Sequence, residues 1–169
     1  MDNHKSGLPK GHFYGASGGG FTGKWIGQKG TFLEGGVRVP AIVSHPAKLP
    51  KGVVRHQVVT AMDWFPTVLE LCGAPQPADA PVLDGRSLLP LIRDPEKKSP
   101  HEVLHFAWGN RWAVRQGDWK LIGVEGRPQA SLHNLADEKP EATNHAKARP
   151  EIVARLRKLH EAWAEEVVP

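Results

Sequence analysis

The chain has 169 residues, enough for one domain with a buried core, and it is 40% hydrophobic and 24% charged. The formal net charge is +4, but the basic residues are scattered and form no nucleic-acid-reading motif, so we expect no nucleic acid partner. The apolar runs are too short for a membrane span, and a single cysteine, Cys72, excludes an intrachain disulfide.

The first third of the chain is predicted to be a long loop followed by a strand. Residues 1–31 are polar and rich in glycine, and residues 1–20 have no apolar signal core. Loops of this length inside compact domains are usually functional or disordered. Residues 37–44, "VRVPAIVS", are typical of a buried strand, and Pro40 favours a position at its edge or start.

A helix is predicted over residues 63–72, "DWFPTVLELC". Asp63 suits the N-cap, Pro66 lies in the first turn, and Gly73 suits the C-terminal stop. The apolar residues recur with helical spacing, so we expect one buried face that includes Cys72 as a structural thiol. That face consists of Phe65, Val68, Leu69 and Cys72. A short helical turn is expected at residues 86–92, after a proline-rich loop.

The pattern changes from residue 101 onward, where short apolar runs alternate with turn residues. Gln116–Gly117–Asp118 predicts a hairpin between two of the runs. The expected strands are 102–108, 111–116, 119–124 and 131–135.

A final helix is predicted over residues 150–166, with Pro150 and Glu151 in its first turn. Its apolar residues form one stripe that can pack on the sheet. The stripe consists of Ile152, Leu156, Leu159 and Trp163.

Two polar groups near the start of the chain are candidates for chemistry. Asp2 and Asn3 supply the oxygen ligands that Ca²⁺ or Mg²⁺ prefers, although a solvated terminus would have the same sequence. Lys29, in "GQKGTFLEGGVRVP", can bind an anionic group such as sulfate or phosphate. Glu34 can pair with Arg38 or orient the loop, although a charged loop before a strand is the alternative interpretation.

Together, these motifs resemble a known family. Asp2–Asn3, a glycine-rich loop and "KGTFLEGGVRVPAIVSHP" look like the second half of a type I sulfatase, which is arylsulfatase-like and belongs to the alkaline phosphatase superfamily. The resemblance continues through four further motifs in the same order. These are "HQVVTAMDWFPTVLELCGAP", "LDGRSLLPLI", "RWAVRQGDWKLI" and "SLHNLADEKPEATNHA".

The resemblance implies an α/β fold. The chain would be the C-terminal part of an alkaline-phosphatase-like sulfatase fold, ending in a small antiparallel sheet packed by a C-terminal helix. Residues 1–95 would belong to the incomplete catalytic domain, and residues 96–169 would form a C-terminal α+β subdomain. Because strands of the catalytic domain would be missing, we expect exposed apolar surface near residues 37–44 and 63–72.

The resemblance also implies roles for individual residues. Asp2 and Asn3 correspond to paired Ca²⁺ ligands of the family, and Lys29 to the catalytic, substrate-binding lysine that contacts the sulfate group. Lys24 is nearby, but its spacing to the Glu-Gly-Gly turn does not fit. The substrate would be a sulfated small molecule or a sulfated glycan, and the full-length protein would be periplasmic or secreted.

The sequence departs from the family pattern in two ways. Met1 and His4 flank the Asp-Asn pair, where the family has a small residue and a glycine. The Cys- or Ser-x-Pro-x-Arg motif, whose first residue becomes the formylglycine nucleophile, does not occur in the chain. We therefore expect the N-terminal half of the enzyme to be missing and the chain alone to be inactive.

Two other functions fit the same residues. One is hydrolysis of a phosphonate or phosphate monoester, because such relatives share the Asp-Asn and lysine features. The other is a non-catalytic binding module derived from a sulfatase. Residues 12–14, "HFY", are candidates for the lining of a substrate cleft, because they lie in the loop between the two parts of the site.

Overall fold

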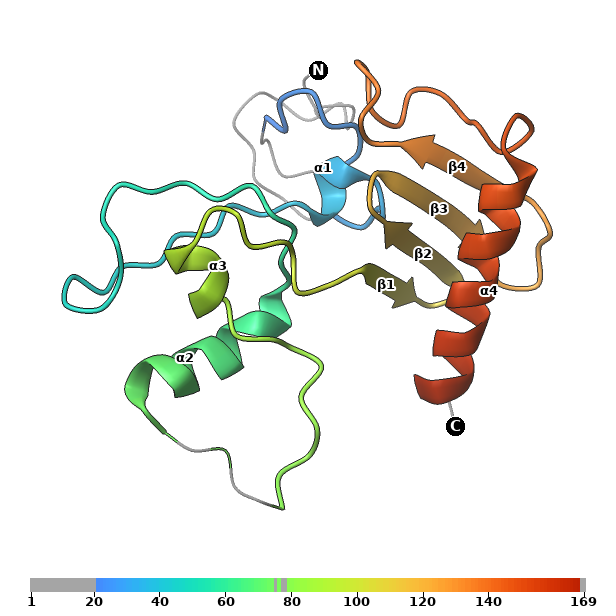
Figure 1. Ribbon diagram of the computed structural model, residues 1–169. Coiled ribbons are helices and arrows are strands. Elements are labelled where there is room, and N and C mark those ends of the chain that lie inside the picture. The colour runs from blue at the N-terminus through green and yellow to red at the C-terminus, as the bar shows by residue number, and fades with distance from the viewer. Residues whose placement is uncertain (1–20, 75, 77–78, 168–169) are drawn as a thin grey trace, which may run out of the picture. The chain divides into compact units, whose positions relative to one another are not determined.

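The computed structural model describes residues 21–74, 76 and 79–167 (Figure 1). The chain divides into two compact units, which we describe separately. The first, here called the sheet unit, comprises residues 21–40 and 103–167 of the described chain, and the second, the helical unit, comprises residues 41–102. Within the described residues, no helix is both long and apolar enough to cross a membrane. The proposed domain boundary between residues 95 and 96 stays a prediction.

The sheet unit contains a four-stranded antiparallel sheet in the order β1-β2-β3-β4. A turn at Gly117–Asp118 joins the second and third strands, and Gly117 has the positive φ of 58° that such a turn requires. The four strands and the hairpin predicted from the sequence are confirmed. Their bounds are β1 (Val103–Trp108), β2 (Arg111–Gln116), β3 (Trp119–Val124) and β4 (Ala130–Asn134).

Helix α4 (Pro150–Val167) covers one face of this sheet (Figure 1). Leu156 is fully buried at the centre of the contact. The predicted stripe is confirmed, because Ile152 and Leu159 pack against the same core and Trp163 stacks on His105 of β1. The strands contribute the remaining buried residues of this core, which are Trp112, Val114, Leu121 and Leu132.

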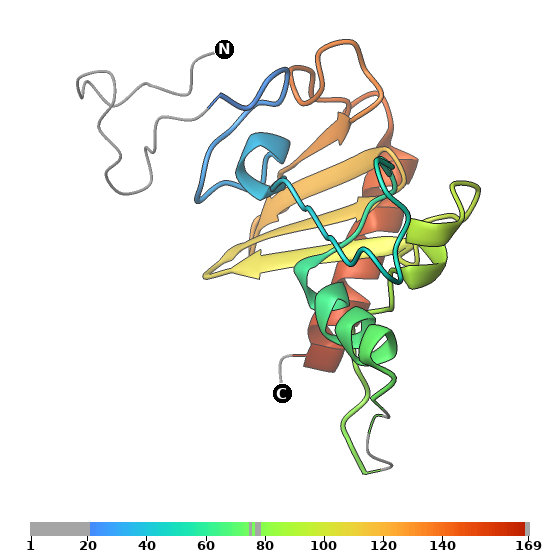
Figure 2. The same cartoon turned by 90° about the vertical axis from the view of Figure 1, so that its left-hand side faces the viewer.

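The opposite face of the sheet carries charged residues. Side chains alternate between the two faces of a strand, so the register that aligns Arg115, Lys120 and His133 places all three on the face away from Leu121. Short helix α1 (Glu34–Val37) lies on this face, and Figure 2 shows it across the sheet from α4. Phe32, just before α1, lies with its ring centroid 6.2 Å from that of Phe106.

The helical unit contains a 3-10 turn η2 (Ala61–Asp63) and helices α2 (Trp64–Cys72) and α3 (Leu89–Arg93). The predicted end of α2 is confirmed, because Gly73 adopts the left-handed conformation that terminates helices. A small leucine-rich core joins these elements. It consists of Leu49, Leu88, Leu89 and Ile92, with Val59, Trp64 and Leu71 packed against it.

Asp63 has a different role from the N-cap role predicted for it. Its carboxylate makes no capping bond to α2 and is completely buried. It accepts hydrogen bonds from the backbone N–H groups of Thr60 (2.7 Å) and Arg86 (2.8 Å), and it pairs with His101 Nε2 at 2.7 Å. Burial alone would raise the pKa of Asp63, but the bonds from Arg86, Thr60 and His101 hold it below its usual value.

The prediction of which side of α2 is buried is wrong. The side that packs on the core is shifted by one residue and carries Trp64, Thr67 and Leu71. Phe65 and Val68 are 59% and 53% exposed, and Cys72 is exposed rather than buried. Instead, Thr67 is buried, and its hydroxyl accepts a hydrogen bond from the backbone N–H of Leu88. The helical period was therefore correct, and the contact with the loop before α3 decided which side of the helix is covered.

The strand predicted at residues 37–44 is not formed. Helix α1 ends at Val37, and the chain then runs to residue 45 without regular structure. A strand needs a neighbour to accept its backbone hydrogen bonds, and none of the described residues pairs with this segment. The expected exposed apolar surface is confirmed, because Val39 and Ile42 are 78% and 93% exposed, in addition to the exposed side chains on α2.

Two histidines lie at the contact between the sheet and α4, His105 on β1 and His160 on α4 itself. The ring of His105 stacks on Trp163, and that of His160 stacks on Trp112 with centroids 4.2 Å apart. The Nδ1 atoms of both histidines are buried without a hydrogen-bond partner among the described residues. Burial, and then the neighbouring His160, lowers the pKa of His105 from its usual 6.5 to about 4. Burial also lowers the pKa of His160.

We expect the sheet unit to lose stability as the pH falls from about 6.5 to about 4. In this range the unfolded chain takes up a proton at residue 105 that the folded chain excludes. Urea unfolding followed by tryptophan fluorescence at pH 7 and pH 5 measures the loss, and His105→Phe should reduce it while retaining the stack on Trp163. His56→Phe, at an exposed position, is the control. An equal pH dependence in wild type and His105→Phe would contradict this assignment.

Candidate functional site

Of the site residues predicted from the sequence, the structure describes only Lys29. Asp2, Asn3 and His4 lie outside the described residues, as do residues 12–14, so their predicted roles have no geometry to test them. Lys29 is described. Within residues 21–74, 76 and 79–167, no group of three or more His, Cys, Asp or Glu side chains is placed to hold a metal ion.

Lys29 lies at the tip of a tight turn formed by residues 28–31. The backbone N–H of Thr31 donates to the carbonyl of Gln28 at 3.0 Å, and the Thr31 hydroxyl donates to the same oxygen at 2.8 Å. Gly30 has a φ of +87°, which suits the third position of a type II turn. The Lys29 side chain is exposed and forms no ion pair with any described residue, so its ammonium is open to an anionic ligand.

The loop that carries this turn is closed at its base, and we call residues 26–36 the Lys29 loop. The N–H of Gly35 donates to the carbonyl of Ile26 at 2.8 Å. A side chain at Gly35 would place its Cβ 2.6 Å from the carbonyl oxygen of Gly27, and one at Gly36 would collide with the carbonyl oxygens of Gln28 and Thr31. The two glycines therefore let α1 pack directly against the backbone of the turn.

A charge cluster joins this loop to the sheet. We call it the buried charge cluster, although Arg38 at its edge is exposed, and it consists of Glu34, Arg38, Arg115, Lys120 and Glu141. Lys120 is completely buried, and its ammonium contacts Glu34 Oε1 at 2.8 Å and Glu141 Oε1 at 3.2 Å. The other Glu34 oxygen accepts from Arg38 Nε at 2.6 Å and from Arg115 Nη1 at 3.3 Å. The Glu34–Arg38 pair expected from the sequence is confirmed.

Glu141 completes the cluster through the backbone of the loop. The N–H of Glu34 donates to both carboxylate oxygens of Glu141, at 3.0 and 2.8 Å. Glu141 adopts a φ of +64°, which is uncommon for a residue other than glycine and indicates that its surroundings determine its conformation. Burial alone would raise the pKa of Glu34, but Lys120, with Arg38 and Arg115, holds it below its usual value. Glu34 is therefore a carboxylate at neutral pH.

Sequence reasoning missed Lys120, Glu141 and Arg115. The available signal was the position of Lys120 in "WKLI", between apolar residues of a strand but on the face away from the apolar core. A lysine at such a position needs an acidic partner when the face is covered. The sequence did not show which acid would be near it.

The surface around the Lys29 loop carries further cations and aromatic rings. The Arg38 guanidinium lies 3.8 Å from the ring centroid of Trp25, and the Lys24 ammonium lies 4.8 Å from it. Trp108 is 63% exposed and lies beside Gly30, with the Arg111 guanidinium 5.6 Å from its ring centroid. These positive charges favour the approach of an anion. Lys24 lies outside the turn at residues 28–31.

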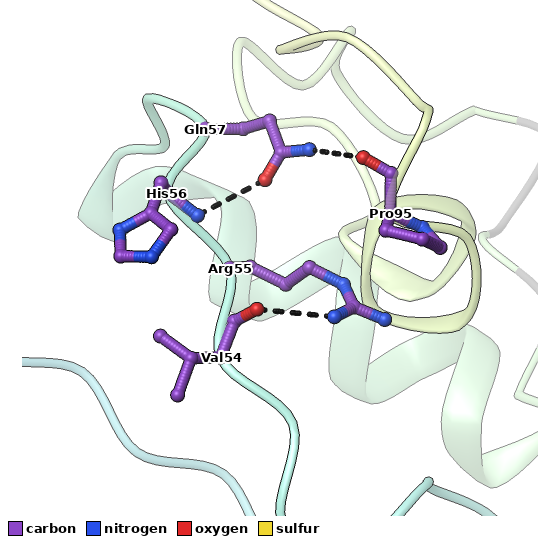
Figure 3. A pocket seen from close by; sticks show the side chains of 5 residues that line it. All are labelled: Val54, Arg55, His56, Gln57 and Pro95. Atoms are coloured by element: carbon purple, nitrogen blue, oxygen red, sulfur yellow. Dashed lines mark hydrogen bonds between the residues drawn. The ribbon is translucent and has the colours of Figure 1, made fainter.

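A pocket of about 360 Å³ lies elsewhere, in the helical unit (Figure 3). It is lined by Val54, Arg55, His56, Gln57 and Pro95. Arg55 Nε and Nη2 donate to the carbonyls of Leu91 and Ile92 at the end of α3, and Nη1 donates to its neighbour Val54. These bonds hold the Arg55 guanidinium against the end of α3, whereas the exposed Lys29 ammonium forms no ion pair with any described residue, so the Lys29 loop is the better candidate.

Comparison with known proteins agrees with this fold. Residues 24–166 match a family model described as N-sulphoglucosamine sulphohydrolase, C-terminal, and the chain belongs to this sulfatase family. Mouse steryl-sulfatase is 44% identical over 110 residues, which cover 62% of this chain and 17% of that protein. Pig N-acetylgalactosamine-6-sulfatase is 44% identical over 102 residues, which cover 60% of this chain and 19% of the relative.

A longer match is found in an uncharacterised sulfatase of Schizosaccharomyces pombe. It is 34% identical over 148 residues, which cover 80% of this chain and 26% of that protein. The chain therefore spans about a quarter or less of the length of these relatives. The resemblance to the C-terminal portion of a sulfatase is confirmed, and so is the α/β fold that ends in an antiparallel sheet and a helix.

We expect Lys120→Met to destabilise the sheet unit by about 3–5 kcal/mol, because it leaves the buried carboxylate of Glu141 without a cation. Urea unfolding at pH 7, followed by tryptophan fluorescence, measures the change. Lys158→Met makes the same substitution at an exposed position of α4 and should cost less than about 1 kcal/mol. Equal costs for the two variants would show that the buried charge cluster does not hold the unit together.

Proposed function

We propose that this chain supplies part of the active site of a sulfatase, in which Lys29 binds the sulfate group of the substrate. The observation that carries the proposal is the exposed Lys29 ammonium at the tip of a closed loop, in a chain of the sulfatase family. The curated relatives are named as sulfatases, which favours a sulfate ester over a phosphate or phosphonate ester. The substrate would be a sulfated small molecule or a sulfated glycan.

In this proposal Lys29 stabilises the negative charge on the sulfate oxygens. Hydrolysis of a sulfate ester breaks the sulfur–oxygen bond to the leaving group, and a fixed ammonium beside the sulfate group favours the charge distribution of the transition state. Water would solvate the same charge less effectively, because its dipoles must reorganise. The Lys29 turn suits this role because hydrogen bonds on both sides hold its backbone.

Asp2 and Asn3 would contribute to a Ca²⁺ site. A carboxylate and a carboxamide are oxygen donors of the kind that Ca²⁺ prefers, so the donor set fits the ion. Two side chains provide fewer than the six to eight oxygens that Ca²⁺ takes, so the remaining ligands would come from outside this pair. When bound, the ion would add positive charge beside the sulfate group.

The nucleophile would come from a part of the enzyme that this chain does not contain. The sequence has no Cys- or Ser-x-Pro-x-Arg motif, and Cys72 precedes "GAPQP" instead. Formylglycine would therefore be formed at a position upstream in a longer protein. The alternative of a non-catalytic binding module remains, and it differs in its response to substitution of Lys29.

We expect the purified 169-residue chain to hydrolyse 4-nitrocatechol sulfate no faster than buffer, with or without added Ca²⁺. The physical reason is that Lys29 and the proposed calcium ligands can stabilise charge but cannot attack sulfur. Robust, metal-dependent turnover by the chain would overturn the proposal. Reading the coding sequence upstream of Met1 for the formylglycine motif provides an independent check.

In the complete enzyme, we expect Lys29→Ala to lower kcat/KM for a sulfate ester by about 100-fold, the usual loss when one stabilising donor is removed. Lys24→Ala is the matched control, because it removes a nearby exposed lysine that lies outside the turn.

Calorimetry with a sulfated glycan tests the alternative of a non-catalytic binding module. Binding that survives both Lys29→Ala and chelation of Ca²⁺ would indicate a separate binding surface.

A further inference from the structure

We propose that Glu34 is a positioning residue, through which the buried charge cluster holds the Lys29 loop in the conformation that presents Lys29 to the sulfate group. This inference rests on the proposed function, because it assigns the cluster a role in substrate binding and turnover beyond stability. Glu34 itself is only 1% exposed, so it acts through Lys29 and does not contact substrate.

The conformation of the loop depends on its base. Residues 26–33 contain no helix or strand, and the hydrogen bonds among them are confined to the turn at residues 28–31. The base is closed by the bond from Gly35 to Ile26, and Glu34 lies directly beside it in the chain. A loop of this kind keeps one conformation only if its ends are fixed to a rigid element.

Glu34 is fixed to the sheet by three separate parts of the chain. Its carboxylate binds Lys120 on β3 and Arg115 on β2, and its backbone N–H binds Glu141 in the segment after β4. These contacts join residues 81 to 107 positions apart. Because the partners act on both the side chain and the backbone, they restrict translation and rotation of residue 34 together.

A displacement at Glu34 would reach Lys29 through backbone contacts. Gly36 packs against the carbonyl oxygens of Gln28 and Thr31, which are the two ends of the Lys29 turn. Gly36 itself has no side chain that could absorb a shift. Movement of α1 away from the sheet would therefore move the turn as well.

The chemistry of the cluster also favours a positioning role. Burying two carboxylates and a lysine carries a large desolvation cost, and apolar residues of similar volume are often equally stabilising in such places. An apolar contact has no directional preference, whereas charge-assisted hydrogen bonds have defined lengths and angles. The cluster therefore specifies a geometry at the base of the loop that apolar packing would leave variable.

Hydrogen–deuterium exchange on the 169-residue chain tests the first step. Glu34→Gln retains the shape and the bond from its N–H to Glu141, but its amide nitrogen would face the donors of Arg38 or Arg115. We expect faster deuterium uptake in peptides covering residues 26–36, with uptake in α4 unchanged. Glu138→Gln, the same substitution at an exposed position in the segment that carries Glu141, should leave both at wild-type rates. Unchanged uptake over residues 26–36 in Glu34→Gln would overturn the inference.

A double-mutant cycle in the complete enzyme separates positioning from general stability. We expect Glu34→Gln to lower kcat/KM by about 10- to 100-fold when Lys29 is present, because small misplacements of a catalytic group have effects of this size. In the Lys29→Ala background the same substitution should have almost no further effect. An equal loss in both backgrounds, or no loss with Lys29 present, would overturn the inference.

Two further outcomes are distinguishable. If Glu34→Gln does not fold, Glu141→Gln replaces it in both experiments, because it weakens the same base while leaving the Glu34–Lys120 pair intact. If Lys29→Ala alone leaves kcat/KM unchanged, the proposed function fails and the role of Glu34 in turnover fails with it. The exchange experiment would then still report whether Glu34 holds the loop.

Discussion

The sheet unit and the candidate site both depend on the ion pairs of Lys120. Its ammonium is completely buried between the carboxylates of Glu34 and Glu141. An isolated charge at that depth would be strongly unfavourable, so Lys120 and Glu141 each require an oppositely charged partner. Glu34 belongs to the loop that carries Lys29, and Lys120 belongs to the centre of the sheet. The pairing of these buried charges therefore joins the Lys29 loop, whose residues 26–33 contain no helix or strand, to the sheet.

The two faces of the sheet perform different tasks. On the face under α4, apolar side chains from β2, β3 and β4 surround Leu156, and burial of apolar surface supplies most of the favourable free energy there. On the opposite face, Arg115 and Lys120 lie side by side across the strands and receive the acidic groups of the loop. The apolar face stabilises the sheet unit but does not determine the conformation of the Lys29 loop. The charged face provides the geometry, and the alternation of side chains along each strand keeps the two apart.

Much of the fold could be predicted from local patterns. The strands and α4 were found because alternation and helical spacing are properties of neighbouring residues, and Gly117 and Pro150 mark their ends through backbone preferences. The two wrong predictions both depended on contacts with distant parts of the chain. The segment "VRVPAIVS" has the composition of a strand, but no described residue pairs with it. Helix α2 has the predicted period but buries Thr67, because the loop before α3 packs on that side.

By itself, the sequence determined the family and the hairpin, because both depend on motifs of residues that are close together in the chain. Asp2 and Asn3 were likewise proposed from an adjacent pair, and they stay predictions. Only the tertiary structure decided that Glu34 pairs with Lys120 and Glu141, which are 86 and 107 residues away from it. The physical reason is that a buried charge takes whichever opposite charge the fold brings within a few ångströms. The spacing of residues along the chain does not show which charged groups will be close together in the fold.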